Sequence, residues 1–167
     1  VGLDQKGGPT VEPCGKCSNC TAIIEGNHVD VLEMDAASRT GVDDIREIIE
    51  SIYYKASSGR FRVYIIDEVH MLSNNAFNAL LKTLEEPPKH VKFIFATTEI
   101  RKVPVTVLSR CQRFDLRRIE PEAMIALLQR IATSEGVNVS EDAFRMITRA
   151  AEGSARDATS LLDQAIS

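Results

Sequence analysis

The sequence lacks an apolar run long enough to cross a membrane, since none approaches the roughly 18 to 20 residues that a spanning helix requires. It also lacks a secretory signal, because residues 1–9 are too polar. Positive charge is not in excess either: 20 Lys and Arg stand against 24 Asp and Glu, for a net charge of −4. We therefore expect a soluble cytoplasmic protein that has no membrane partner, and any contact with DNA must be local.

A further absence concerns nucleotide binding. No phosphate-binding loop of the form G-x-x-x-x-G-K-S/T occurs in the 167 residues, and residue 1 is Val rather than Met. Because other parts of an ATPase site follow in order along the chain, we interpret the sequence as a fragment that begins downstream of its own phosphate-binding loop. We expect this fragment to be inactive as an ATPase by itself.

The two ends of the chain differ from its middle in composition and periodicity. Residues 1–28 are rich in Gly and Pro, carry three of the four Cys and show no helical or strand period. We expect a zinc-binding module there. After Pro121 the strand patterns stop, and apolar residues at helical spacing predict three amphipathic helices. Residues 120–167 are therefore predicted to form a small helical bundle.

Strand and helix patterns alternate in the middle of the chain, between residues 29 and 119. Apolar runs rich in strand-forming residues predict strands at 29–35, 61–66 and 92–96. Helices are predicted to begin near Thr40 and Asn74, and Pro87 and Pro88 stop the second one because proline lacks the amide and clashes with the preceding turn. This alternation predicts an α/β fold with a parallel sheet and right-handed crossovers.

Asp67 and Glu68 come directly after the apolar residues of the second predicted strand. Open α/β sheets bind their ligands at the carboxyl ends of such strands. Asp67 would hold the Mg²⁺ that bridges the β- and γ-phosphates of ATP, and Glu68 would polarise the attacking water. An ordinary acidic turn is the alternative, but the motifs that follow favour the catalytic interpretation.

Two later motifs supply further groups for the same chemistry. Thr98 follows the third predicted strand, where a hydroxyl can hydrogen-bond a γ-phosphate or the attacking water, although threonine at a strand end can also reflect strand propensity alone. Arg110 lies in a Ser-Arg-Cys triplet that begins eleven residues after Thr98. Arginine suits transition-state charge because its planar fork stays protonated and can bind two phosphate oxygens.

Arg156 occupies the first turn of the last predicted helix, for which Ser154 is a natural N-cap. The helix dipole disfavours a cation at this end. A positive charge placed there indicates an anionic partner, and the alternative is a salt bridge to Glu152 or Asp157.

Cys14, Cys17 and Cys20 place three thiols within seven residues. In a reducing cytosol this spacing favours thiolate ligation of Zn²⁺ over disulfides. A structural zinc site needs four ligands, and either His28 or a cysteine upstream of residue 1 could be the fourth. We expect Cys111 to lie far from this cluster as a buried thiol.

Together these residues resemble the AAA+ clamp-loader ATPases of bacterial DNA polymerase III. The similarity extends over essentially all 167 residues, and it rests on the cysteine cluster and on the motifs Asp35–Thr40, Tyr64–Leu72, Asn78–Pro88, Ser109–Cys111 and Gly153–Asp157. It implies a partial AAA+ core at 29–119, a zinc module at 1–28 and a three-helix lid domain at 120–167.

The resemblance also implies a role for each site residue. Asp67 and Glu68 match the Walker B pair, and Thr98 matches the sensor-1 position. Arg110 matches the arginine finger that acts on the ATP of the adjacent subunit, and Arg156 matches the sensor-2 arginine of the lid. The zinc module of the family has four cysteines, and Gln5 stands where the first would fall.

The implied function is ATP-driven loading of a sliding clamp onto primed DNA within the DNA polymerase III holoenzyme. The implied partners are the delta and delta-prime subunits, further gamma/tau copies, the clamp and the DNA, and the implied cofactors are ATP, Mg²⁺ and Zn²⁺. Two alternatives are a delta-prime-type subunit and a non-catalytic assembly scaffold. The intact Asp67-Glu68 pair followed by His70 favours a catalytic gamma/tau type.

Overall fold

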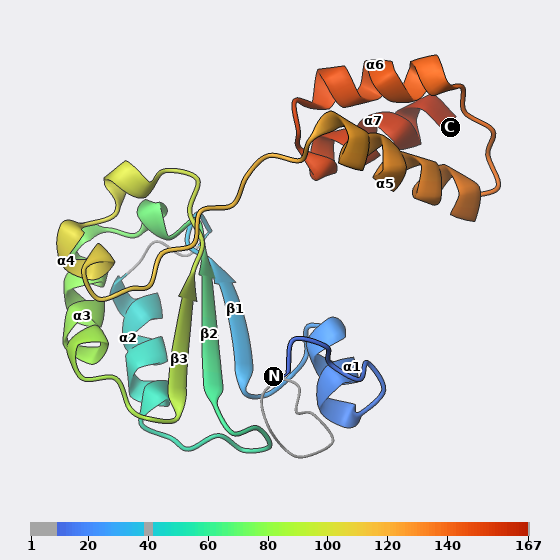
Figure 1. Ribbon diagram of the computed structural model, residues 1–167. Helices are drawn as coiled ribbons and strands as arrows, with labels where there is room; N and C mark the ends of the chain where they lie inside the picture. Colours follow the sequence, from blue (N-terminus) through green and yellow to red (C-terminus); the bar gives the residue numbers. More distant parts are fainter. Residues whose placement is uncertain (1–9, 39–41, 167) are drawn as a thin grey trace. The chain divides into compact units, whose positions relative to one another are not determined.

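The computed structural model describes residues 10–38 and 42–166, which form two compact units that divide after Arg113. The first unit is built on a parallel three-stranded sheet in the order β1-β2-β3 (Figure 1). Its strands are β1 (Val31–Asp35), β2 (Arg62–Asp67) and β3 (Val91–Phe95). The register pairs Asp35 with Asp67 and Ile66 with Phe95, so the carboxyl ends of the three strands meet at one edge.

Helices α2 (Val42–Ile52) and α3 (Asn74–Glu85) connect the strands and lie together on one face of the sheet (Figure 1). The first unit also contains short helical segments, namely α1 (Ser18–Ile24), η1 (Val69–Met71), η2 (Ile100–Lys102) and α4 (Val105–Leu108). The second unit is formed by α5 (Pro121–Ser134), α6 (Glu141–Ala151) and α7 (Ala155–Ile166). Among the residues that the structure describes, no helix has the length and hydropathy needed to cross a membrane.

The core of the first unit lies between the sheet and its two helices. Strand β2 is central, and four of its six residues are buried or half-buried apolar side chains, which is typical of a strand with neighbours on both sides. The buried side chains that pack together here are Ala36, Ile45, Ile66, Val69, Leu72, Ala76, Phe77, Leu80, Val103 and Val107. This packing holds the end of β2, and with it the Asp67-Glu68 pair, in a fixed position.

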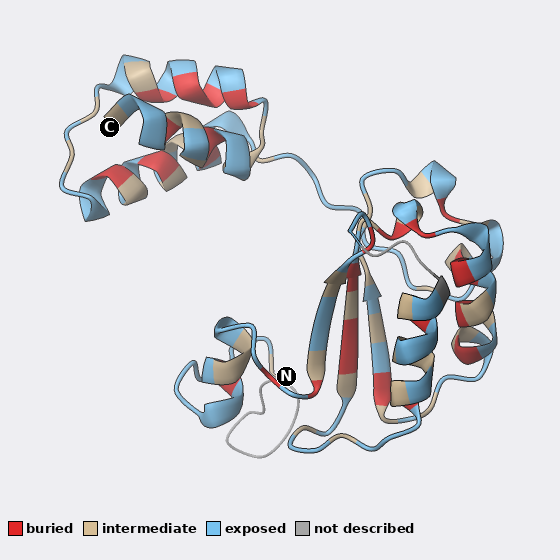
Figure 2. Cartoon of the chain, turned by 180° about the vertical axis from the view of Figure 1, so that it is seen from behind, coloured by how far each residue is buried: buried red, intermediate tan, exposed pale blue. Residues whose placement is uncertain are grey.

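The second unit has a hydrophobic core of its own. Its helices turn their buried residues toward one another and their exposed residues outward (Figure 2). The buried set is Met124, Leu128, Ala132, Phe144, Ile147, Ala151, Ala158 and Leu162. Pro121 stands in the first turn of α5, where its missing amide is no loss, and the Ser140 hydroxyl caps α6 by accepting from the Ala143 amide.

The predicted fold class is confirmed: a parallel α/β sheet is followed by three helices, and the predicted strands agree with the observed ones to within two residues. Residues 18–24 form α1, in a segment whose sequence shows no helical period. A helix of seven residues is too short to show an amphipathic period, and this one is capped by a Cys17 thiol that accepts from the Cys20 amide. The helix start predicted at Thr40 lies outside the described residues.

A buried carboxylate fastens the loop that leads into β2. Asp30 is fully buried, and its two oxygens accept hydrogen bonds from the amides of Ser57, Ser58 and Gly59, each at 2.7 Å. Burial raises the pKa of Asp30, but the three backbone donors outweigh it and lower the pKa to about 2. The loop is therefore tied to the start of β1 by an ionised side chain.

Candidate functional site

The carboxyl edge of the sheet gathers the groups that the sequence placed in one site. Asp67 is the last residue of β2 and is exposed there, opposite Asp35 of β1. Its backbone carbonyl accepts from the Ala36 amide at 3.0 Å, and its Oδ1 accepts from the Glu68 amide at 2.9 Å. An exposed carboxylate held at a strand end in this way can ligate a hard cation such as Mg²⁺.

Glu68 adopts a left-handed backbone conformation, with φ 45° and ψ 43°. For a residue other than glycine this conformation costs about 1 to 3 kcal/mol, so packing around the turn must maintain it. The Val69 amide does so by donating to the Ala96 carbonyl at 2.9 Å. As a result the Glu68 side chain reaches the end of β3 rather than continuing along β2.

Thr98 meets Glu68 at this edge. Its hydroxyl donates to Glu68 Oε2 at 3.1 Å, and its amide lies 3.4 Å from the same oxygen. Thr98 is exposed and Glu68 is half-buried, so both groups remain reachable from solvent. The structure thus brings together Asp67, Glu68 and Thr98, as the sequence predicted.

His70 is part of the same cluster, although the sequence analysis gave it no chemical role. Its Nδ1 lies 2.8 Å from Thr97 Oγ1 and 3.2 Å from Glu68 Oε2, and its Nε2 lies 3.6 Å from Glu99 Oε1. A hydrogen bond from Lys102 lowers the pKa of Glu99, against a smaller raising effect of burial. Only its position two residues after Glu68 could have indicated His70 from sequence.

Arg110 does not join this cluster. Its Nη2 lies 2.6 Å from Glu85 Oε1, and its Nη1 donates to the Thr106 carbonyl at 2.6 Å. Glu85 is the last residue of α3, whereas Asn74, close after the Glu68 turn, is the first. A helix of this length spans about 18 Å, so the guanidinium is held toward the opposite end of α3 from Glu68.

Arg156 lies in the second unit, in the first turn of α7. The Ser154 hydroxyl accepts from the Asp157 amide at 3.3 Å, which confirms the predicted N-cap. Within the described part of the chain, neither Glu152 nor Asp157 forms a salt bridge with Arg156, whose side chain is exposed. The local salt bridge considered as the alternative to an anionic partner is therefore not formed.

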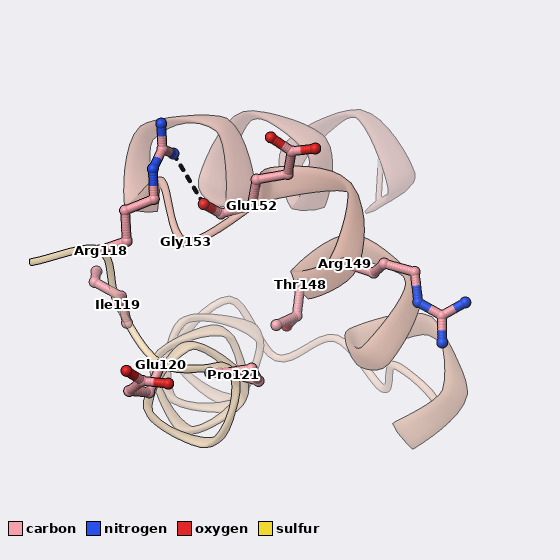
Figure 3. Close-up of a pocket in the computed structure, with 8 residues that line it drawn as sticks. All are labelled: Arg118, Ile119, Glu120, Pro121, Thr148, Arg149, Glu152 and Gly153. Carbon is pink, nitrogen blue, oxygen red and sulfur yellow. Dashed lines mark hydrogen bonds between the residues drawn. The ribbon is translucent and has the colours of Figure 1, made fainter.

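The turn that leads into α7 is tightly constrained. Gly153 has φ 80°, and a Cβ at this position would lie 2.8 Å from the Arg118 Cβ. The Gly153 carbonyl accepts from the Ile119 amide at 3.1 Å, and Arg118 Nη1 donates to the Glu152 carbonyl at 2.8 Å (Figure 3). These residues border a cavity of about 290 Å³ between the start of α5 and the end of α6.

Cys14, Cys17 and Cys20 are gathered as predicted, with their three sulfur atoms within 4.8 Å of one another. The Cys14 and Cys20 sulfurs are 3.8 Å apart, which matches the separation of about 3.8 Å expected for two thiolates at 2.3 Å from a tetrahedral Zn²⁺. Hydrogen bonds from the backbone of Lys16 and Cys17 lower the pKa of Cys14 to about 7, which favours the thiolate. The donor set therefore fits zinc.

His28 does not complete this set. Its Nδ1 accepts from the Asp30 amide at 3.0 Å, and its Nε2 lies 3.2 Å from Asn19 Oδ1. Both ring nitrogens are thus engaged away from the thiols, so His28 is not placed as the fourth ligand. Cys111 packs against the core of the first unit, where burial raises its pKa.

Comparisons with known protein families match nearly the whole chain. The family model described as DNA polymerase III, delta subunit, matches residues 4–120. The family model described as DNA polymerase III clamp loader subunit, ATPase lid domain, matches residues 124–167.

Individual relatives agree with the family models. The DNA polymerase III subunit tau of Escherichia coli K12 is 53% identical over 165 residues, which are 99% of this chain and 26% of that protein. The subunit tau of Bacillus subtilis 168 is 54% identical over 159 residues, or 95% of this chain and 28% of that protein. The chain thus spans about a quarter of the length of these curated relatives.

Solved structures show the same fold at lower identity. A DNA polymerase III gamma subunit-related protein of Thermotoga maritima has a TM-score of 0.61 and 24% identity, over 80% of this chain and 42% of that one. The RuvB Holliday junction branch migration motor of the same organism has a TM-score of 0.67 and 19% identity, over 86% of this chain and 47% of that one.

Proposed function

Because the chain belongs to the family of bacterial DNA polymerase III clamp-loader subunits, we propose that it is the part of an AAA+ ATPase subunit that carries the hydrolytic carboxylates. In the assembled protein, ATP hydrolysis would drive the loading of a sliding clamp onto primed DNA. The observation that carries this proposal is the left-handed turn at Glu68, which places a carboxylate beside an exposed threonine hydroxyl at the ligand-binding edge of the sheet.

The two carboxylates divide the work in this proposal. Asp67 would hold a Mg²⁺ ion, which would supply positive charge to neutralise the nucleotide phosphates. Glu68 polarises the water that attacks the γ-phosphate. Thr98 is shared between two tasks, since its hydroxyl now donates to Glu68 and can turn to a γ-phosphate oxygen.

Arg110 serves a neighbouring subunit rather than its own site. Support comes from its contacts with Glu85 and Thr106, which hold the guanidinium toward the far end of α3 from Glu68. An arginine finger supplied in trans stabilises the transferred phosphoryl group and accelerates hydrolysis by about 10³ to 10⁵. Hydrolysis then depends on assembly, so that ATP is consumed only when subunits are correctly placed.

Arg156 binds nucleotide phosphate from the helical unit. Its exposed guanidinium has no ion pair with its acidic neighbours, although the start of a helix disfavours a cation. An anionic ligand would offset that unfavourable position. In this proposal the helical segment 120–167 is the lid, residues 29–119 belong to the ATPase core, and 1–28 form the zinc module.

The zinc module is structural in this proposal. Cys14, Cys17 and Cys20 would hold one Zn²⁺ together with a fourth ligand from elsewhere in the protein, and the ion would lie apart from the nucleotide. The partners of the assembled subunit would be delta, delta-prime and further gamma/tau copies, with the clamp and primed DNA as its substrates. A non-catalytic scaffold is the competing function, and it requires no active carboxylate.

Glu68→Gln in the full-length subunit tests the proposal. With its partner subunits and primed DNA, the variant should lose ATP turnover by at least about a hundredfold while its ATP affinity stays within about twofold, because only water activation is removed. Glu50→Gln, which changes an exposed glutamate of α2, is the matched control. Unchanged turnover in Glu68→Gln would favour the scaffold.

A further inference from the structure

The side chain of His70 is buried beside the carboxylate of Glu68, and it has no role in the hydrolysis mechanism proposed above. Only 6% of its side chain is exposed. It lies in η1, the single turn that follows the strained residue Glu68. Its imidazole faces the carboxylates of Glu68 and Glu99, so the position of the ring affects how these two side chains are held.

The two oxygens of Glu68 have different surroundings. Oε2 accepts from the Thr98 hydroxyl at 3.1 Å and from the Thr98 amide at 3.4 Å, and it lies 3.2 Å from His70 Nδ1. Oε1 has no hydrogen bond to any of the residues that the structure describes. One oxygen is therefore anchored from two sides, and the other is left available to a water molecule.

Two oxygens lie within reach of His70 Nδ1. Thr97 Oγ1 is its hydrogen-bond partner at 2.8 Å, and Glu68 Oε2 lies 3.2 Å away. In the tautomer with a proton on Nδ1, the ring N–H can donate toward both oxygens. Thr97 Oγ1 is itself fixed by the Glu99 amide, which donates to it at 3.0 Å.

We propose that His70 is a positioning residue for Glu68. Its Nδ1–H holds Oε2 of Glu68, so that Oε1 is presented to the attacking water, and Thr97 and Glu99 fix the ring that does so. This inference rests on the proposed ATPase function and deepens it. His70 touches neither water nor nucleotide in this account, and it acts only through the carboxylate.

Amide substitutions separate this role from simple packing. Asn can place its side-chain N–H near the position of Nδ1, whereas Gln reaches the position of Nε2 and leaves Oε2 with its Thr98 donors alone. Both replacements remove the ring and cost packing. If His70 only fills space, Asn and Gln should therefore behave alike.

The experiment uses the full-length subunit assembled with its partner subunits on primed DNA. ATP turnover, the KM for ATP, ATP affinity and the thermal midpoint are measured for His70→Asn, His70→Gln and His70→Ala. We expect His70→Gln and His70→Ala to lower kcat about 10- to 100-fold with KM within about twofold, and His70→Asn to keep kcat within about fivefold of the unchanged protein.

Equal kcat values for His70→Asn and His70→Gln, or a loss of kcat that follows the fall in thermal midpoint, would overturn the inference. Glu68→Gln is measured in parallel to test the underlying function. If the unchanged protein turns over ATP and Glu68→Gln does not, failure of the His70 series concerns His70 alone. If Glu68→Gln is fully active, the proposed function fails and this inference fails with it.

Discussion

At the scale of single residues, buried charge is accommodated by local hydrogen bonds. Asp30 is ionised in the interior because the amides of Ser57, Ser58 and Gly59 converge on it. A hydrogen bond to a charged group contributes about 1.5 to 3 kcal/mol, and a buried donor that loses its partner costs a similar amount. The side chain therefore stabilises the fold only while it carries its charge.

Asp30→Asn should lower the free energy of unfolding by about 3 kcal/mol at neutral pH, because a neutral amide cannot accept from all three amides. The pKa of Asp30 is about 2 in the folded protein, below its ordinary 3.8. Its contribution is thus complete above about pH 4 and is lost as the pH falls toward 2. Urea unfolding at pH 6 and pH 3 should show that the difference in free energy of unfolding between the variant and the unchanged protein is smaller at pH 3.

Asp142→Asn is the control for that measurement, because Asp142 is exposed at the start of α6. It should change stability by less than about 0.5 kcal/mol at both pH values. A loss of similar size in the two variants would show that the Asp30 network does not stabilise the fold.

Residue identities could be predicted from sequence more readily than their contacts. Asp67, Glu68 and Thr98 were recognisable because they follow predicted strands, and parallel strands end at a common edge. The contact of His70 with Thr97 was not predictable, because it depends on the left-handed backbone conformation of Glu68. Glycine is the residue that usually indicates such a conformation in a sequence, and this position is a glutamate. The Arg110–Glu85 contact joins residues 25 apart and has no sequence pattern.

At the scale of elements, the turn between α6 and α7 governs how Arg156 is presented. Gly153 combines a positive φ with a close approach of the Arg118 side chain and the Ile119 backbone. Gly153→Ala should destabilise the helical unit by about 2 to 4 kcal/mol, since the left-handed conformation costs about 1 kcal/mol and overpacking adds about 1 to 3. Urea unfolding monitored by helical circular dichroism measures the change.

Gly136→Ala separates the two contributions. Gly136 also has a positive φ, 70°, but no atom lies within 4 Å of its would-be Cβ. It should lose only about 1 kcal/mol. If both variants lose the same amount, the close approach at Gly153 does not constrain the turn.

Elements with a long period were predictable, and short ones were not. The three helices after Pro121 show apolar stripes over 11 to 14 residues, and each has a core face in the structure. Helix α1 has seven residues and α4 has four, so neither can display a repeat. Both depend on contacts that only the folded chain supplies.

At the scale of the whole molecule, the proposed catalytic residues of the described chain lie in two separate places. Asp67, Glu68 and Thr98 form one cluster at the sheet edge, while Arg110 is held toward the other end of α3. We interpret this separation as division between the subunit's own ATP and that of a neighbour.

The most direct test mixes full-length subunits in the assembled complex. DNA-stimulated ATPase is measured for equimolar mixtures of unchanged subunits with Glu68→Gln subunits, and with subunits that carry Glu68→Gln and Arg110→Ala together. If Arg110 acts in trans, the doubly changed copy also disables the intact site that it faces, where turnover falls by about 10³ or more. The second mixture is then slower than the first at equal assembly, as checked by light scattering. Equal rates in the two mixtures would mean that Arg110 serves only its own subunit, and they would contradict the account.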